Sequence, residues 1–165
     1  MSTINNFEII SFSNINQVHK EYIFNLWNAE YPEKLAFKSL LNVDIYLNGL
    51  IEAKHFFVVD NLNQLQSWAV IFERDYEKWF AIIIDESFQK LGLGTLILNR
   101  LKSFSSELNG WVIDHENDIK SNGKPYLSPL PFYLKNNFIE IPETRLELEN
   151  ISAVKINWKE KREAN

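Results

Sequence analysis

The chain has 165 residues, 45% hydrophobic and 14% aromatic, so it is long enough to bury one sizeable core in a single domain spanning residues 1–165. Its formal net charge of −5 argues against binding of nucleic acid through a large positively charged surface. Its lack of cysteine excludes disulfides, thiolate zinc sites and a cysteine nucleophile. No apolar run approaches the roughly 20 residues of a membrane helix and no signal peptide is visible, so we expect a cytoplasmic protein that binds neither membrane nor nucleic acid.

The first third of the chain predicts a strand followed by two helices. Residues 7–12 are typical of a short strand, and Ser13 or Asn14 can cap the helix that follows. Apolar residues then recur at helical spacing until Pro32 ends the pattern. A weaker helix is expected over residues 39–50, with Gly49 near its end.

Three strands are expected next, over residues 55–59, 68–73 and 79–84. Turn-forming residues at 61–64 and 74–77 separate them. The third segment, Trp79-Phe80-Ala81-Ile82-Ile83-Ile84, is continuously apolar, as in a strand that is buried on both faces. We therefore place residues 79–84 at the centre of the sheet.

The last part of the chain predicts two more helices and three more strands. A helix after Gly92 carries one apolar face, made of Leu93, Leu96, Ile97, Leu101 and Phe104. A strand at 111–113, a polar stretch at 114–124 and a short helix from Ser128-Pro129 follow, and Asn137 can take the left-handed conformation that stops this helix. Strands at 138–141 and 151–158 complete an α/β (α+β) fold, a mixed, largely antiparallel sheet of about six to seven strands flanked by helices.

The most informative segment joins the central strand to the helix after it. Gly92 and Gly94 lie at the start of that helix, where glycine costs roughly 1 kcal/mol relative to alanine. Unpaired N–H groups and the positive end of the helix dipole favour phosphate there when no side chain blocks the backbone. A P-loop would need Gly-Lys-Ser/Thr, and the dinucleotide fingerprint would need a third glycine at Ile97. An ordinary strand-to-helix turn remains the alternative.

Gln89, Gly92 and Gly94 match, position for position, the Gln/Arg-x-x-Gly-x-Gly/Ala motif, and the segment resembles the acetyl-CoA-binding motif of the GNAT superfamily of N-acyltransferases. Residues 131–138, Pro-Phe-Tyr-Leu-Lys-Asn-Asn-Phe, resemble the later Phe-Tyr-x-x-x-Gly-Phe helix of that family, with Asn137 in place of glycine. The resemblance implies that acetyl-CoA is the acyl donor. The positions implied to bind it are Ile82, Ile83 and Ile84 for the pantetheine arm, Lys90, Leu91, Gly92, Leu93, Gly94 and Thr95 for the pyrophosphate, and also Gln89 and Asn117.

The resemblance also implies direct attack of an amine on the thioester, with no covalent enzyme intermediate. Tyr133 matches the tyrosine that often lies beside the sulfur in this family; the alternative is a core tyrosine with a satisfied hydroxyl. The nearest candidates for a base are Asp114 and His115, at the end of the strand at 111–113. A solvated loop histidine and a water relay are the alternatives for that role.

The sequence therefore predicts an N-acetyltransferase that acts on an amine of a small molecule or a protein, as a monomer or homodimer. A non-catalytic acyl-CoA-binding regulatory module of the same fold is the alternative, and a plain interaction domain is a third possibility. With three histidines and no cysteine, a metal site has little support. His19 and His55 lie on expected secondary structure and are interpreted as structural residues.

Overall fold

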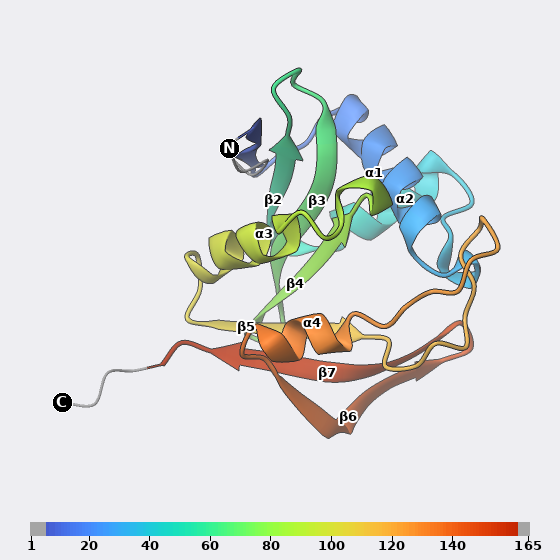
Figure 1. The fold of residues 1–165 in the computed structure, drawn as a ribbon, viewed down its shortest axis with the longest axis vertical. Helices are drawn as coiled ribbons and strands as arrows, with labels where there is room; N and C mark the ends of the chain where they lie inside the picture. Colours follow the sequence, from blue (N-terminus) through green and yellow to red (C-terminus); the bar gives the residue numbers. More distant parts are fainter. Residues whose placement is uncertain (1–5, 162–165) are drawn as a thin grey trace.

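The computed structural model of the chain describes residues 6–161, which form one mixed sheet with helices on both faces (Figure 1). Its elements are β1 (Glu8–Phe12), α1 (Gln17–Glu30), η2 (Glu33–Leu35), α2 (Leu40–Asn48), β2 (Ile51–Val59), β3 (Leu65–Arg74), β4 (Glu77–Ile84), η3 (Glu86–Phe88), α3 (Leu93–Lys102), β5 (Glu107–Val112), α4 (Leu130–Lys135), β6 (Ile139–Leu148) and β7 (Ile151–Lys159). The predicted order of helices and strands is confirmed.

The seven strands lie in the order β1-β2-β3-β4-β5-β7-β6. All neighbouring strands pair antiparallel except β4 and β5, which pair parallel. Strand β4 lies fourth of seven, so the central position predicted from its apolar run is confirmed. The fold class expected from the sequence is also confirmed.

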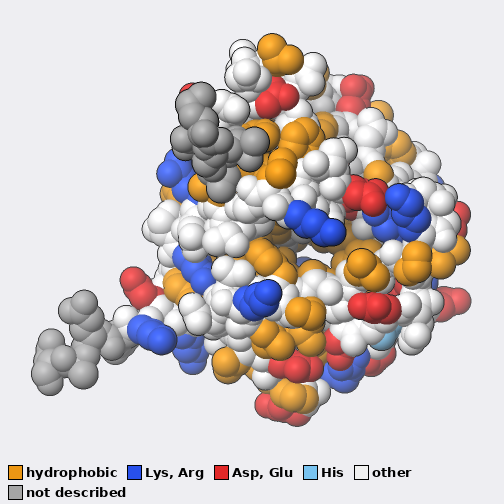
Figure 2. All heavy atoms as spheres, in the orientation of Figure 1, with side chains coloured by type: hydrophobic (Ala, Val, Ile, Leu, Met, Phe, Trp, Pro, Cys, Tyr) orange, Lys and Arg blue, Asp and Glu red, His pale blue; other side chains and the backbone are white. Residues whose placement is uncertain are grey.

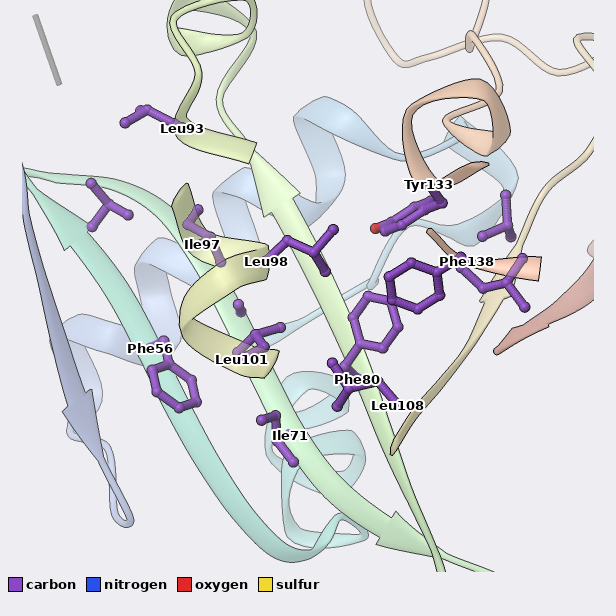
Figure 3. Close-up of a cluster of buried hydrophobic side chains, with 14 residues drawn as sticks. Phe56, Ile71, Phe80, Leu93, Ile97, Leu98, Leu101, Leu108, Tyr133 and Phe138 are labelled. Atoms are coloured by element: carbon purple, nitrogen blue, oxygen red, sulfur yellow. The ribbon is translucent and has the colours of Figure 1, made fainter. Parts of the chain in front are cut away.

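Each face of the sheet carries its own hydrophobic core because neighbouring strand residues point to opposite faces. Helices α3 and α4 cover one face, where Ile97, Leu98 and Tyr133 pack on strand residues such as Phe56 and Phe80 (Figure 3). Helices α1 and α2 cover the other face and pack on a second set of buried strand residues, which includes Phe57, Trp68, Val70 and Phe72.

Local signals placed some helix ends correctly and one wrongly. Helix α1 is capped by Asn16, not by Ser13 or Asn14. The Asn16 side chain accepts a hydrogen bond from the His19 amide at 2.9 Å, and the His19 ring accepts one from the Asn16 amide at 3.3 Å. This reciprocal pair satisfies two amides that Ser13 or Asn14 could not reach. At the other end of the chain, Asn137 has φ 71°, the left-handed conformation predicted for it.

Strand β5 begins at Glu107, four residues before the predicted start at 111. The polar residue Asn109 interrupts the apolar pattern, yet it is fully buried. Its side chain donates to the Lys78 carbonyl at 3.1 Å and accepts from the Asn157 side chain at 2.8 Å. Because both hydrogen bonds come from distant parts of the chain, local pattern could not reveal that this residue belongs to a strand. Phe104 likewise lies beyond the end of α3 and is 45% exposed.

Buried His55 on β2 predicts a pH-dependent stability. Its Nδ1 accepts a hydrogen bond from the Trp68 indole at 3.1 Å, and burial lowers the pKa of His55 from 6.5 to about 4. The unfolded chain therefore binds this proton more readily, so the free energy of unfolding should fall as pH drops from about 6.5 toward 4, by at most about 1.4 kcal/mol per pH unit.

His55→Gln should remove that part of the slope, because glutamine can still accept from Trp68 but cannot titrate in this range. Urea unfolding at a series of pH values would measure it. Equal slopes for the variant and the wild-type protein would show that His55 does not contribute.

Among the described residues, no helix is both long enough and apolar enough to cross a membrane.

Candidate functional site

The site begins where the parallel strands β4 and β5 separate. They pair at Trp79 and Asn109, and beyond that point they diverge toward their carboxyl ends (Figure 1). Where the two strands begin to diverge, a Cβ on Gly110 would lie 2.9 Å from the Phe80 ring. Glycine at this position therefore lets the Phe80 ring fill the narrow end of the gap between the strands. The edge of β4 that carries Ile82, Ile83 and Ile84 therefore faces the opening, where an extended ligand can add hydrogen bonds like another strand.

The segment after β4, residues 85–92, is here called the glycine turn. Lys90 and Gly92 have φ 72° and 83°, and Gly92 is the N-cap of α3. No side chain caps α3, so the N–H groups of its first turn stay available at the positive end of the helix. Figure 2 shows a hollow between the glycine turn and α4, with Lys or Arg side chains at its rim. This arrangement suits phosphate groups.

Gly94 has a packing reason to lack a side chain. A Cβ there would lie 3.0 Å from the Phe132 ring of α4 and 3.3 Å from Ile84. The close packing of α3, α4 and the end of β4 thus requires glycine at position 94, whether or not a ligand binds there. Leu93, one residue earlier, is fully buried, while Thr95 is exposed.

Tyr133 extends from α4 toward β4 and Leu98 of α3 (Figure 3). Its ring packs edge-on against Phe80 and Phe138, with centroids 5.6 Å and 5.4 Å away. No described residue accepts a hydrogen bond from its hydroxyl, and burial raises its pKa above the usual value. A tyrosine in this state keeps its proton and can donate a hydrogen bond to a ligand that enters beside β4.

Residues 114–128, here called the connecting loop, run from β5 to α4 and pack against the carboxyl end of α1. The Glu33 amide donates to the Ile119 carbonyl at 2.8 Å, and the Ser121 hydroxyl donates to the Asn28 carbonyl at 3.0 Å. Lys34 forms an ion pair with Asp118 at 2.8 Å. These contacts fix the loop against the end of α1 and against η2.

Asp114 and His115, the two candidates for a catalytic base, each contact a different residue. Asp114 receives two hydrogen bonds from Arg145 of β6, at 2.8 Å and 3.0 Å, and this guanidinium lowers the pKa of Asp114. His115 instead lies near Asp118, with 3.9 Å from its Nε2 to the carboxylate, and its Nδ1 accepts from the Asn117 amide at 3.1 Å. Arg145 is thus the main partner of Asp114, and the carboxylate of Asp118 lies near His115.

Asn117, predicted on the CoA arm, lies beside η2. It lines a hollow of about 180 Å³ together with Glu33, Lys34, Asp118 and Ile119, and no residue of α3 contributes to that hollow. A larger hollow of about 350 Å³ lies between the β1–α1 connection and the end of α2, and none of the motif residues lines it. The candidate site thus rests on the geometry of the strand opening rather than on hollow size.

Sequence reasoning missed Glu30, the last residue of α1. Its carboxylate accepts from the Gln89 side chain at 3.2 Å and lies 3.5 Å from the Lys120 ammonium. Burial raises the pKa of Glu30, although Lys120 opposes the rise. No motif marks a glutamate 59 residues before its partner, so only the folded chain reveals it. Within residues 6–161, no group of three His, Cys, Asp or Glu residues is arranged to hold a metal ion.

No protein-family model and no curated protein matches the chain. Solved structures do match. A protein assigned as a phosphinothricin N-acetyltransferase has a TM-score of 0.68 at 13% identity, over 94% of this chain and all of that one. Spermidine N-acetyltransferase from Vibrio cholerae, solved with CoA and spermine, has a TM-score of 0.65 at 15% identity, over 94% and 96%. A chimera of the Vibrio cholerae enzyme and hSSAT has a TM-score of 0.65 at 19% identity, over 93% and 95%. The chain therefore has the fold of the GNAT N-acetyltransferases.

Proposed function

We propose that this protein is an acetyl-CoA-dependent N-acetyltransferase that transfers the acetyl group directly to an amine. The observation that carries the proposal is the opening between β4 and β5, which leads to the uncapped start of α3 at Gly92. The similar enzyme from Vibrio cholerae was solved with CoA and an amine, spermine, and this supports the same kind of substrates here.

The chain offers a separate group for each part of the donor. The first-turn amides of α3, at Leu93, Gly94 and Thr95, would hold the pyrophosphate, and the open edge of β4 at 82–84 would hold the pantetheine arm. With a net charge of −5, the chain relies on these local donors more than on its overall field. Affinity for CoA should therefore fall only moderately with salt.

Acetyl-CoA supplies a thioester, whose C–S bond breaks as a bond forms between the acceptor nitrogen and the acetyl carbon, while the amine loses one proton and the departing sulfur gains one. The Tyr133 hydroxyl would donate a hydrogen bond to that sulfur. His115 is the proposed acceptor of the amine proton, directly or through water. The connecting loop, which carries His115, would form the acceptor side of the site.

An assay that adds amines to the protein and acetyl-CoA, and measures the CoA thiol released, would test the proposal. We expect CoA release that depends on both acetyl-CoA and an added amine, across a panel of polyamines, small monoamines and lysine peptides. Tight CoA binding without turnover of any amine would instead identify a regulatory acyl-CoA-binding module. Calorimetry that detects no binding of CoA would leave an interaction domain.

His115→Ala tests the assignment of the base. If His115 accepts the amine proton, its loss should lower kcat/KM and remove the acidic limb that a general base gives to the pH profile. Binding of CoA should stay unchanged. His19→Gln is the control, because it removes a histidine at the opposite end of α1. A pH profile that is the same in His115→Ala and the wild-type protein would rule out this role.

A further inference from the structure

We propose that Glu30 is a positioning residue that links the two sides of the active site, because one of its carboxylate oxygens holds the glycine turn and the other holds the connecting loop. This inference rests on the proposed function, since it concerns how the donor site communicates with the acceptor wall. Three elements that are far apart in the sequence meet at this one carboxylate: the end of α1, the turn after β4 and the loop after β5.

The first contact is to the donor motif. The Gln89 side-chain amide donates to Glu30 Oε2 at 3.2 Å and to the Ile84 carbonyl at 3.1 Å. Gln89 therefore ties the last carbonyl of β4 to α1. Because Gln89 precedes the left-handed residues Lys90 and Gly92, its placement sets the direction in which the chain enters α3.

The second contact is to the connecting loop. The Lys120 ammonium lies 3.5 Å from Glu30 Oε1 and 3.7 Å from Glu86, which belongs to the glycine turn. The Glu30 and Lys120 side chains are only 9% and 10% exposed. A buried charge that loses its partner is strongly destabilised, so the Glu30–Lys120 pair resists separation. The position of the loop is thereby linked to the position of the glycine turn.

The loop has other anchors. Lys124 pairs with Glu86 of the glycine turn at 3.4 Å, but these side chains are 65% and 51% exposed, so this contact is weaker than the buried one to Glu30. The remaining anchors do not reach the turn. Lys34 pairs with Asp118 at 2.8 Å, and the Glu33 amide bonds to Ile119 at 2.8 Å. Both contacts join the loop to η2. The chain thus offers a matched comparison: Lys34 anchors the loop alone, whereas Glu30 anchors the loop and the turn together.

Hydrogen exchange of the full chain, with and without free CoA, would test the coupling. In the wild-type protein, CoA should slow exchange at the hydrogen-bonded loop amides of Lys120, Gly123 and Tyr126 by at least about fivefold, the lower end of typical couplings between sites. Glu30→Gln keeps the shape of the side chain but removes its charge. This variant should still bind CoA, yet CoA should no longer slow exchange in the loop.

Lys34→Met is the control, and it should retain the response to CoA. Calorimetry separates the possible failures: no CoA binding by the wild-type protein would refute the proposed function, whereas binding without a loop response would refute only the coupling. An equal response in Glu30→Gln and wild type, or an equal loss in Lys34→Met, would also overturn it. If thermal unfolding shows that Glu30→Gln does not fold, Lys120→Met breaks the same contact from the loop side and should give the same result.

Discussion

Gly92→Ala is expected to weaken CoA binding at least about tenfold. Gly92 has φ 83°, a conformation that costs an L-residue roughly 1–2 kcal/mol, and about 1.4 kcal/mol corresponds to a factor of ten in affinity. An alanine that relaxes toward negative φ would turn the amides of Leu93 and Gly94 away from the opening. Isothermal titration of CoA into the variant would measure the loss.

Gly123→Ala is a closely matched control for this change. Gly123 has φ 84°, and a Cβ there would meet no other atom within 4 Å, so alanine brings the same backbone strain without a steric clash. Because Gly123 lies in the connecting loop and not at a helix start, its variant should bind CoA as tightly as the wild-type protein. Unchanged CoA affinity in Gly92→Ala would remove the start of α3 from the proposed site.

Gly94→Val is expected to abolish CoA binding, but for two combined reasons. The new Cβ would lie 3.0 Å from the Phe132 ring, so α4 must shift as well as the backbone at the helix start. Thermal unfolding of this variant must therefore accompany the binding measurement. For this reason the comparison of Gly92 with Gly123 is the more direct test of the phosphate site.

The fold could be predicted from the sequence because its signals are local. Continuous apolar residues at 79–84 indicated the central strand, and Ser39 caps α2 where a helix was expected. Asn137 takes the left-handed conformation for which a short polar side chain is suited. In each case, residues close together in the chain determine the outcome, so spacing and residue type are sufficient.

The details of the site could not be predicted because they depend on contacts between distant residues. Asp114 pairs with Arg145, 31 residues later. Asn109 is buried through hydrogen bonds to Lys78 and Asn157, so its polar side chain gave no local sign that it belongs to strand β5. No periodicity encodes such pairs. The start of the helix at Gly92 could therefore be predicted from the sequence, whereas the side-chain partners around it could not.

Tyr133→Phe is expected to lower kcat by about 10²–10⁴-fold while leaving the affinity for acetyl-CoA almost unchanged. Only the hydroxyl is lost, and no described residue depends on it, so the ring should still pack against Phe80 and Phe138. Burial raises the pKa of Tyr133, which makes full proton transfer to a thiolate more costly than for a free tyrosine. The hydroxyl is therefore expected to act as a hydrogen-bond donor to the departing sulfur.

The raised pKa also fixes how turnover should depend on pH. A hydroxyl with a raised pKa stays protonated to higher pH, so Tyr133 should produce no basic limb in the kcat profile below about pH 10, the pKa of free tyrosine. Tyr46→Phe is the matched control, because burial also raises the pKa of Tyr46, to about 12, but this tyrosine lies on α2 and packs against Trp27 of α1 and against Phe37. Its variant should turn over at the wild-type rate. Wild-type kcat in Tyr133→Phe would reduce Tyr133 to a packing residue, whereas equal losses in both variants would indicate that a buried hydroxyl matters only for stability.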